Sequence, residues 1–178
     1  MIKFAQIFVL ALGFWCVMPP VQAQQTDAQG IKWYTFEEAV ELSKTQPRKI
    51  VIDLYTHWCG WCKRMDKNTF SDSTVAAYVN ANFYPVKFNA EQREVVQFNG
   101  YTFKFMEQGS GGVHELAYSL LEGKLGYPTL VYLNEKFERI LISPGYKEPA
   151  GLMQELQFTK GEFYNKMTFD QYKAVGNE

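Results

Sequence analysis

The feature that most constrains this chain is a pair of cysteines placed directly after an apolar run. Residues 50–54, Ile-Val-Ile-Asp-Leu, lead into Tyr-Thr-His-Trp-Cys-Gly-Trp-Cys, which places Cys59 and Cys62 three positions apart. A run rich in β-branched residues with almost no polar alternation is typical of a central strand that is covered on both faces. A cysteine pair at this spacing can be half of a zinc site, a structural disulfide or a redox centre.

The number of possible ligands decides between these three interpretations. The chain has three cysteines, and one of them, Cys16, lies in an apolar N-terminal stretch. A closed zinc site needs four ligands, and beyond the pair only His57 and His114 could supply imidazole nitrogens. A disulfide that closes so short a loop removes little entropy from the unfolded chain, and a domain of this size folds without it. We therefore expect redox chemistry at Cys59 and Cys62, without a metal or another cofactor.

The N-terminal residues have the pattern of a secretory signal. Lys3 provides a positive charge, residues 7–18 are apolar, two prolines follow, and residues 21–23 include a small residue suited to cleavage. The apolar stretch is short for a membrane span, although an uncleaved anchor is the alternative. We expect the protein to be secreted across the inner membrane and to be periplasmic.

The chain is predicted to have three parts: a signal peptide at residues 1–23, a flexible leader at 24–30 and one domain at 31–178. At 47% hydrophobic residues, the composition supplies ample material for a core. The formal net charge of −1 gives no basic surface of the kind that binds nucleic acid. We expect no nucleic-acid partner, and we expect a monomer.

Helical and strand patterns alternate along the domain. We expect helices that begin at the capping box of Thr35 and Glu38, at the cysteines (running to about residue 68), and at a cap formed by Asp72 or Ser73. Further helices are expected at residues 113–121, 148–158 and 168–174. Strands are expected at residues 31–34, 49–55, 83–88, 129–133 and 139–142. Strand-helix alternation followed by a pair of strands predicts an α/β sandwich with a mixed sheet, with 168–174 as an extra C-terminal helix.

An additional segment, at about residues 91–112, interrupts this alternation. Asn99-Gly100 between two short runs of β-forming residues predicts a β-hairpin. Residues 107–112 are expected to be a flexible joint. The aromatic side chains of this segment either cover the core of the domain or hold a partner; they are Phe98, Tyr101, Phe103 and Phe105.

The predicted helix start gives the two cysteines different roles. Unpaired N–H groups and the helix dipole favour a thiolate at Cys59, so its pKa should lie below the usual value of about 8.5. We expect Cys59 to be exposed and to attack a disulfide. Cys62 should lie one turn deeper and release the product, Gly60 should keep the turn open, and Trp61 should influence the reduction potential.

Asp53 is a carboxylate within an otherwise apolar strand. Its side chain lies on the same face as Val51 and Tyr55. Burial of a carboxylate is costly unless the group is paired or protonated. Two interpretations stay open: Asp53 reaches a lysine or water near the strand end, or burial raises its pKa and it accepts the proton of Cys62.

Three separated segments resemble the thioredoxin family. Residues 51–55 followed by 58–63, Trp-Cys-Gly-Trp-Cys-Lys, resemble the active-site strand and helix, with Asp53 in the place of the buried acid. Residues 86–89, Val-Lys-Phe-Asn, resemble the next strand, whose lysine lies near that acid; the lysine here is Lys87. Residues 126–130, Gly-Tyr-Pro-Thr-Leu, are similar to the loop in which a cis-proline faces the cysteines.

The resemblance covers about residues 35–158 and implies a thioredoxin fold with a central mixed sheet flanked by helices and a hairpin inserted before the cis-proline loop. Secreted bacterial members are similar, among them the C-terminal periplasmic domain of the membrane thiol-disulfide interchange protein, which has a stretch comparable to Thr-Phe-Ser-Asp at residues 69–72. The dipeptide between the cysteines is Gly-Trp where thioredoxin itself has Gly-Pro, so thioredoxin's potential is not carried over.

The family likeness implies a thiol-disulfide oxidoreductase. Cys59 would attack, and Cys62 would resolve the mixed disulfide with help from Asp53 and Lys87. The substrate-binding residues would be Trp58, Gly60, Trp61, Tyr127 and Pro128.

The expected partners are protein disulfides or dithiols and an unidentified electron donor, for which a membrane protein is one option. Reduction is the expected direction: the acid and the lysine favour it, because uptake of the proton from Cys62 speeds resolution. The alternatives are a disulfide oxidase or isomerase, and a partner-binding module that uses the aromatic hairpin.

Overall fold

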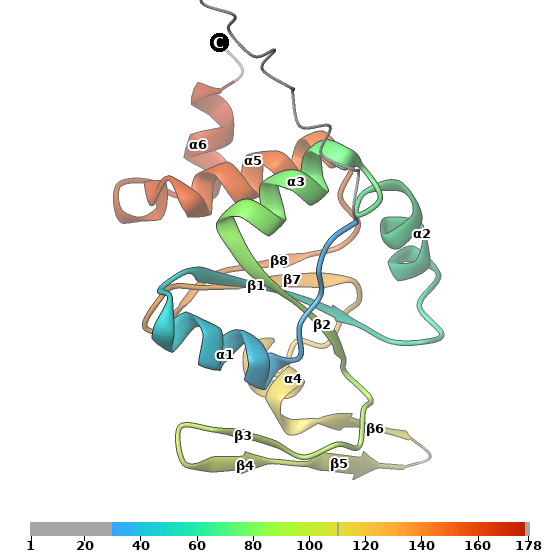
Figure 1. Cartoon of the computed structure of the whole chain (residues 1–178). Coiled ribbons are helices and arrows are strands. Elements are labelled where there is room, and N and C mark those ends of the chain that lie inside the picture. The colour runs from blue at the N-terminus through green and yellow to red at the C-terminus, as the bar shows by residue number, and fades with distance from the viewer. Residues whose placement is uncertain (1–29, 110, 177–178) are drawn as a thin grey trace, which may run out of the picture.

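A four-stranded mixed sheet forms the centre of the protein. The computed structural model describes residues 30–109 and 111–176 (Figure 1). The strand order is β2-β1-β7-β8, in which β1 (Lys49–Tyr55) pairs parallel to β2 (Phe83–Asn89) and antiparallel to β7 (Thr129–Leu133). β8 (Arg139–Pro144) pairs antiparallel to β7. The predicted mixed sheet is therefore confirmed.

Helices cover both faces of this sheet (Figure 1). On one face lie α1 (Phe36–Thr45) and α4 (Glu115–Leu120), and on the other α3 (Ser73–Asn82) and α5 (Pro149–Lys160). α2 (Gly60–Asn68) follows the carboxyl end of β1. The chain continues through the short 3₁₀ helix η1 (Phe163–Asn165) to α6 (Phe169–Val175), which contacts α5.

Side-chain caps fix where the predicted helices begin. Thr35 and Glu38 form a reciprocal capping box at α1, and Thr168 and Gln171 form another at α6. Asp72 accepts hydrogen bonds from two backbone N–H groups at the start of α3. Each cap satisfies N–H groups that the helix cannot, which stabilises it by about 1 kcal/mol.

Alternation along β1 divides the core into two layers. Ile50, Ile52 and Leu54 are buried against α1 and α4. Val51 belongs to the second cluster, with side chains of α3 and α5. Because side chains alternate along a strand, Asp53 lies on the face of Val51, as predicted.

Two element boundaries differ from the sequence prediction. No strand forms at residues 31–34, where Tyr34 makes only an isolated parallel bridge to Val86. The helix expected from residue 113 begins at Glu115, because the two preceding residues belong to a strand. The predictions for residues 1–29 lie outside the described residues. Within the described part of the chain, no helix is both long and apolar enough to cross a membrane.

The insertion before α4 is a pair of hairpins. β3 (Val96–Phe98) and β4 (Tyr101–Phe103) form the predicted hairpin, with positive φ at both turn residues, Asn99 (50°) and Gly100 (77°). β5 (Phe105–Gln108) and β6 (Gly111–His114) form a second antiparallel pair. The flexible joint predicted at residues 107–112 is therefore wrong, because Glu107 pairs with Gly112 and Gln108 with Gly111.

The insertion packs against the domain through part of its aromatic surface. Phe98 makes edge contacts with Phe36 of α1 and with Phe137, at ring-centroid distances of 5.3 and 5.5 Å. Val96 and Val113 are buried in the same cluster, whereas Tyr101 is 55% exposed. The aromatic residues of the insertion therefore serve partly as core and partly as surface.

Gly112 allows the second hairpin to close. A Cβ atom at this position would overlap the ring of Phe105 and the carbonyl oxygen of Met106. We expect Gly112→Ala to destabilise the protein by about 1–3 kcal/mol, as overpacking does. Denaturant unfolding measures the change. Gly111→Ala is the matched control, since its added Cβ would meet open space; equal losses in the two variants would contradict the steric argument.

Candidate active site

The two cysteines form a disulfide at the start of α2. Their Cα atoms are 5.3 Å apart. Cys59 is the N-cap residue, and its Sγ accepts a hydrogen bond from the backbone N–H of Cys62 at 3.1 Å. The sulfur of Cys59 therefore lies where N–H groups point and where the helix dipole stabilises negative charge.

Both cysteines are almost completely buried. Cys59 is 4% exposed and Cys62 is 2% exposed. The expected exposure of Cys59 is wrong for this disulfide state, because its sulfur turns inward to cap the helix and to bond Cys62. The neighbouring tryptophans are the exposed groups, Trp58 at 67% and Trp61 at 56%.

The loop before β7 contains a cis peptide bond between Tyr127 and Pro128, as expected from the family likeness. The carbonyl of Pro128 accepts a hydrogen bond from the N–H of Gly145 at 2.8 Å. The Tyr127 ring makes an edge contact with Trp58 at 6.1 Å. Burial, together with the charge of Glu91, raises the pKa of Tyr127 to about 12, so its phenol is neutral. The structure thus brings together two of the predicted substrate-binding side chains.

Asp53 and Lys87 form an ion pair between neighbouring strands. They stand opposite each other in the β1–β2 register, and Lys87 Nζ donates to Asp53 Oδ2 at 2.6 Å. Asp53 is 1% exposed, and its Oδ1 has no hydrogen-bond partner among the described residues. Burial raises the pKa of Asp53 to about 6, although Lys87 acts in the opposite direction. Asp53 is therefore paired with a lysine, and its pKa is nevertheless shifted towards neutral pH.

Asp66 is a second carboxylate on the same lysine, which the sequence analysis missed. Lys87 Nζ also forms an ion pair with Asp66 of α2, whose side chain is 47% exposed. The charge of Asp66 adds to the raised pKa of Asp53. The spacing offers a signal, because Asp66 lies four residues after Cys62 and hence one helical turn along. Lys87 thus links a buried acid to one that solvent reaches.

Glu91, which contacts Trp58, is another residue of the site that was not predicted from the sequence. Trp58 Nε1 donates to Glu91 Oε1 at 2.9 Å, and Glu91 lies at the beginning of the insertion. His57 is exposed and contacts the ring of Tyr55 at 5.6 Å. The insertion thus contacts the active-site surface through Glu91.

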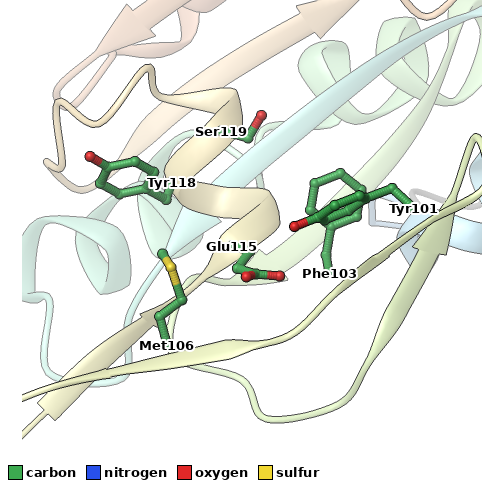
Figure 2. Close-up of a pocket in the computed structure, with 6 residues that line it drawn as sticks. All are labelled: Tyr101, Phe103, Met106, Glu115, Tyr118 and Ser119. Carbon is green, nitrogen blue, oxygen red and sulfur yellow. The ribbon is translucent and has the colours of Figure 1, made fainter.

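The insertion also carries a hollow of about 410 Å³, which Figure 2 shows between α4 and the hairpins. Its lining combines aromatic rings with a thioether, a carboxylate and a hydroxyl group, from Tyr101, Phe103, Met106, Glu115, Tyr118 and Ser119. Among the described residues, no cluster of three or more His, Cys, Asp or Glu side chains could hold a metal ion.

Comparison with known proteins assigns the chain to a family. A family model described as "Thioredox_DsbH: Protein of unknown function, DUF255" matches residues 21–160. The chain belongs to this DsbH family. The match includes the disulfide, the ion pair of Asp53 with Lys87 and the cis-proline loop.

Individual relatives match only parts of the chain. A thiol:disulfide interchange protein DsbD from Vibrio vulnificus (strain YJ016) is 36% identical over 70 residues, which are 38% of this chain and 12% of that protein. An uncharacterized protein from Archaeoglobus fulgidus is 28% identical over 87 residues, 49% of this chain and 65% of that protein. The chain therefore spans less than two thirds of the length of either relative.

Solved structures confirm the predicted thioredoxin fold. A DsbH oxidoreductase superposes with a TM-score of 0.58 at 15% identity, covering 81% of this chain and 94% of that one. A thioredoxin from Thermus thermophilus has a TM-score of 0.56 at 19% identity, covering 74% and 88%. A putative disulphide-isomerase from Bacteroides thetaiotaomicron has a TM-score of 0.52 at 26% identity, covering 72% and 92%. The DsbH-family chain therefore has a thioredoxin fold that carries a CXXC disulfide.

Proposed function

We propose that this protein reduces disulfide bonds in other proteins outside the cytoplasm. The observation that carries the proposal is the Cys59–Cys62 disulfide at a helix N-terminus, in a fold that also contains the Asp53–Lys87 pair and a cis-proline loop. A disulfide in this position can open to give a stabilised thiolate and close again on a neighbouring thiol.

The reaction begins with the reduced protein. The Cys59 thiolate attacks one sulfur of a substrate disulfide, and the other substrate sulfur leaves as a thiolate that takes a proton from water. Cys62 gives its proton to the Asp53 carboxylate and attacks Cys59, which releases the second substrate thiolate and forms the Cys59–Cys62 disulfide. Two electrons pass from the protein to the substrate, and a thiol donor must then restore the reduced form.

The cis-proline loop supports the choice of a protein substrate. Tyr127 precedes Pro128 in a cis peptide bond, and its backbone can pair with an extended segment in the manner of strand addition. The exposed rings of Trp58 and Trp61, which flank Cys59 in the sequence, provide apolar surface at the site.

The paired acid supports reduction as the direction. The pKa of Asp53, raised to about 6 by burial, places a proton acceptor close to neutral pH. The reduction potential tests the direction: a value near −270 mV, as in thioredoxin, supports a reductase, and one near −120 mV supports an oxidase.

Location and electron donor are further parts of the proposal. The apolar N-terminal pattern supports export, and N-terminal sequencing of the protein recovered from a periplasmic extract tests it, with Gln24 as the expected first residue. The similarity of 70 residues to a DsbD supports a membrane protein as donor of electrons.

Substitution of the second cysteine should trap partners. Without the thiol of Cys62, the mixed disulfide at Cys59 has no internal route to resolution. We expect Cys62→Ala to accumulate covalent adducts that dithiothreitol releases, as seen by non-reducing electrophoresis. The double variant lacking both cysteines is the control. A folded Cys62→Ala protein that forms no adducts would contradict the proposal.

A second candidate function is recognition by the insertion. The hollow in Figure 2, with Tyr101 and Tyr118 exposed at 55% and 44%, favours contact with a partner at this site. Introducing Tyr101→Ser into the Cys62→Ala protein tests this function. A changed set of trapped partners, with unchanged adduct formation by a small disulfide, would assign recognition to the insertion.

A further inference from the structure

Arg64 occupies an unusual position beside the active-site disulfide. It lies on α2 two residues after Cys62. The guanidinium carbon is 5.3 Å from the ring centroid of Trp61 and 5.6 Å from that of Tyr146. These two rings are themselves 5.5 Å apart. The guanidinium and the two rings therefore form one compact cluster that joins α2 to the segment after β8.

The guanidinium in this cluster has no anionic partner in the described part of the chain. Lys87 contacts two carboxylates and Arg139 contacts Glu122, but Arg64 takes part in no ion pair or side-chain hydrogen bond with a described residue. Arg64 also lines a hollow of about 290 Å³, together with Gly60 and Trp61. Because Gly60 and Trp61 separate the two cysteines, this hollow adjoins the disulfide loop.

The contacts with Trp61 and Tyr146 orient the Arg64 guanidinium, which favours binding of a carboxylate. A guanidinium that lies against aromatic rings is held in place, so less conformational freedom is lost when it binds. Its planar set of N–H donors matches the two oxygens of a carboxylate in a bidentate contact. A lysine ammonium in solvent is neither held against aromatic rings nor able to bind both carboxylate oxygens with a planar set of donors.

The two exposed tryptophans of the site are associated with opposite charges. Trp58 donates to the carboxylate of Glu91, whereas Trp61 lies against Arg64. A substrate segment that lies over the disulfide therefore meets a negative group beside one tryptophan and a positive group beside the other. Such an arrangement favours one orientation of a charged segment.

We propose that Arg64 binds a carboxylate of the substrate, namely an Asp or Glu side chain close in sequence to the cysteine that Cys59 attacks. The proposal rests on the proposed function and names a preferred class of substrate for the same site. An extended segment advances by about 3.3 Å per residue, so an acidic residue about two positions from the substrate cysteine lies within reach of a group bordering the disulfide loop.

Two disulfide-linked peptides that differ at one position test this specificity. Each is a symmetric dimer of one short peptide, with either Glu or Gln two residues after its cysteine. The reduced protein is mixed with each dimer, and the second-order rate constant of its oxidation is followed by tryptophan fluorescence. We expect the Glu peptide to react about fivefold faster than the Gln peptide, as fits a charge-assisted contact at a largely exposed site.

Arg64→Gln should bring the ratio of the two rate constants to about one, and Arg64→Lys should restore only part of it. Lys67→Gln, which removes an exposed charge from the last turn of α2, is the matched control and should keep the wild-type ratio. A wild-type ratio near one, or an unchanged ratio in Arg64→Gln, would overturn the inference while leaving the proposed function in place. If the reduced, folded wild-type protein reacts with neither peptide, the proposed function fails, and the inference fails with it.

Discussion

Replacing Cys59 with serine is expected to lower the rate of insulin reduction by at least about a thousandfold, because an alcohol at this position supplies no thiolate to attack a disulfide. Cys59 is the N-cap of α2, and serine is also a good N-cap residue, so the helix should persist. Insulin turbidity in the presence of dithiothreitol measures the rate, and circular dichroism checks the fold.

A neighbouring variant separates this effect from general damage. His57 is exposed and contacts only the ring of Tyr55 among the aromatic contacts of the described residues. We expect His57→Gln to keep the wild-type rate within about twofold, as surface substitutions commonly do. Substantial turnover by Cys59→Ser would show that another group attacks the substrate.

Replacing Asp53 with asparagine is expected to slow resolution of the mixed disulfide by about 10- to 100-fold at pH 7, as fits the loss of a general base. Asp53 acts as a base only when it is deprotonated, and burial raises its pKa to about 6. The wild-type rate should therefore rise with pH through about 6, and this rise should be absent in Asp53→Asn. Single-turnover rates across pH 5–8 measure both effects.

The same substitution should stabilise the protein at neutral pH. The pKa of Asp53 is raised from 3.8 to about 6, so the folded state holds this proton more tightly than the unfolded chain. Stability therefore falls as pH rises from about 4 to about 6, and above this range the full cost is about 3 kcal/mol. We expect Asp53→Asn to unfold at higher denaturant concentration at pH 7 and to match the wild type near pH 4.

Replacing Asp66 with asparagine tests the same account, because the effect of Asp66 on the pKa of Asp53 has a known direction. Its negative charge adds to the raised pKa of Asp53. Asp66→Asn removes that charge and leaves Lys87 to Asp53 alone, so the pKa of Asp53 should fall. The pH at which the rate is half of its maximum should shift to lower values, whereas an upward shift would contradict this account of the three groups.

Local sequence signals were sufficient for most of the fold. The capping box at Thr35 and the turn at Asn99-Gly100 act within a few residues, and each formed where it was expected. The continuous apolar run of β1 identified the central strand. The cis-proline was expected only from the family likeness, since spacing alone does not distinguish cis from trans peptide bonds.

The features that were missed depend on contacts between distant segments. The glycines near residue 112 suggested flexibility, but Gly112 accommodates the ring of Phe105 in a second hairpin. In the sequence alone, Asp66 is indistinguishable from an ordinary exposed charge. Its role depends on the ion pair with Lys87, which is distant in the sequence. Arg64 likewise gains significance only when the chain brings Tyr146 to the same place.

The burial of both cysteines affects which molecules can exchange electrons with the disulfide. In the disulfide state, Cys59 and Cys62 are only 4% and 2% exposed, so little of either residue is open to a freely diffusing thiol or peroxide. A macromolecule that docks across the surface and displaces the covering side chains has access that a small metabolite lacks. A disulfide covered in this way is expected to exchange more slowly with small thiols than with a docked partner protein, which would limit exchange between reducing and oxidising pathways in the same compartment.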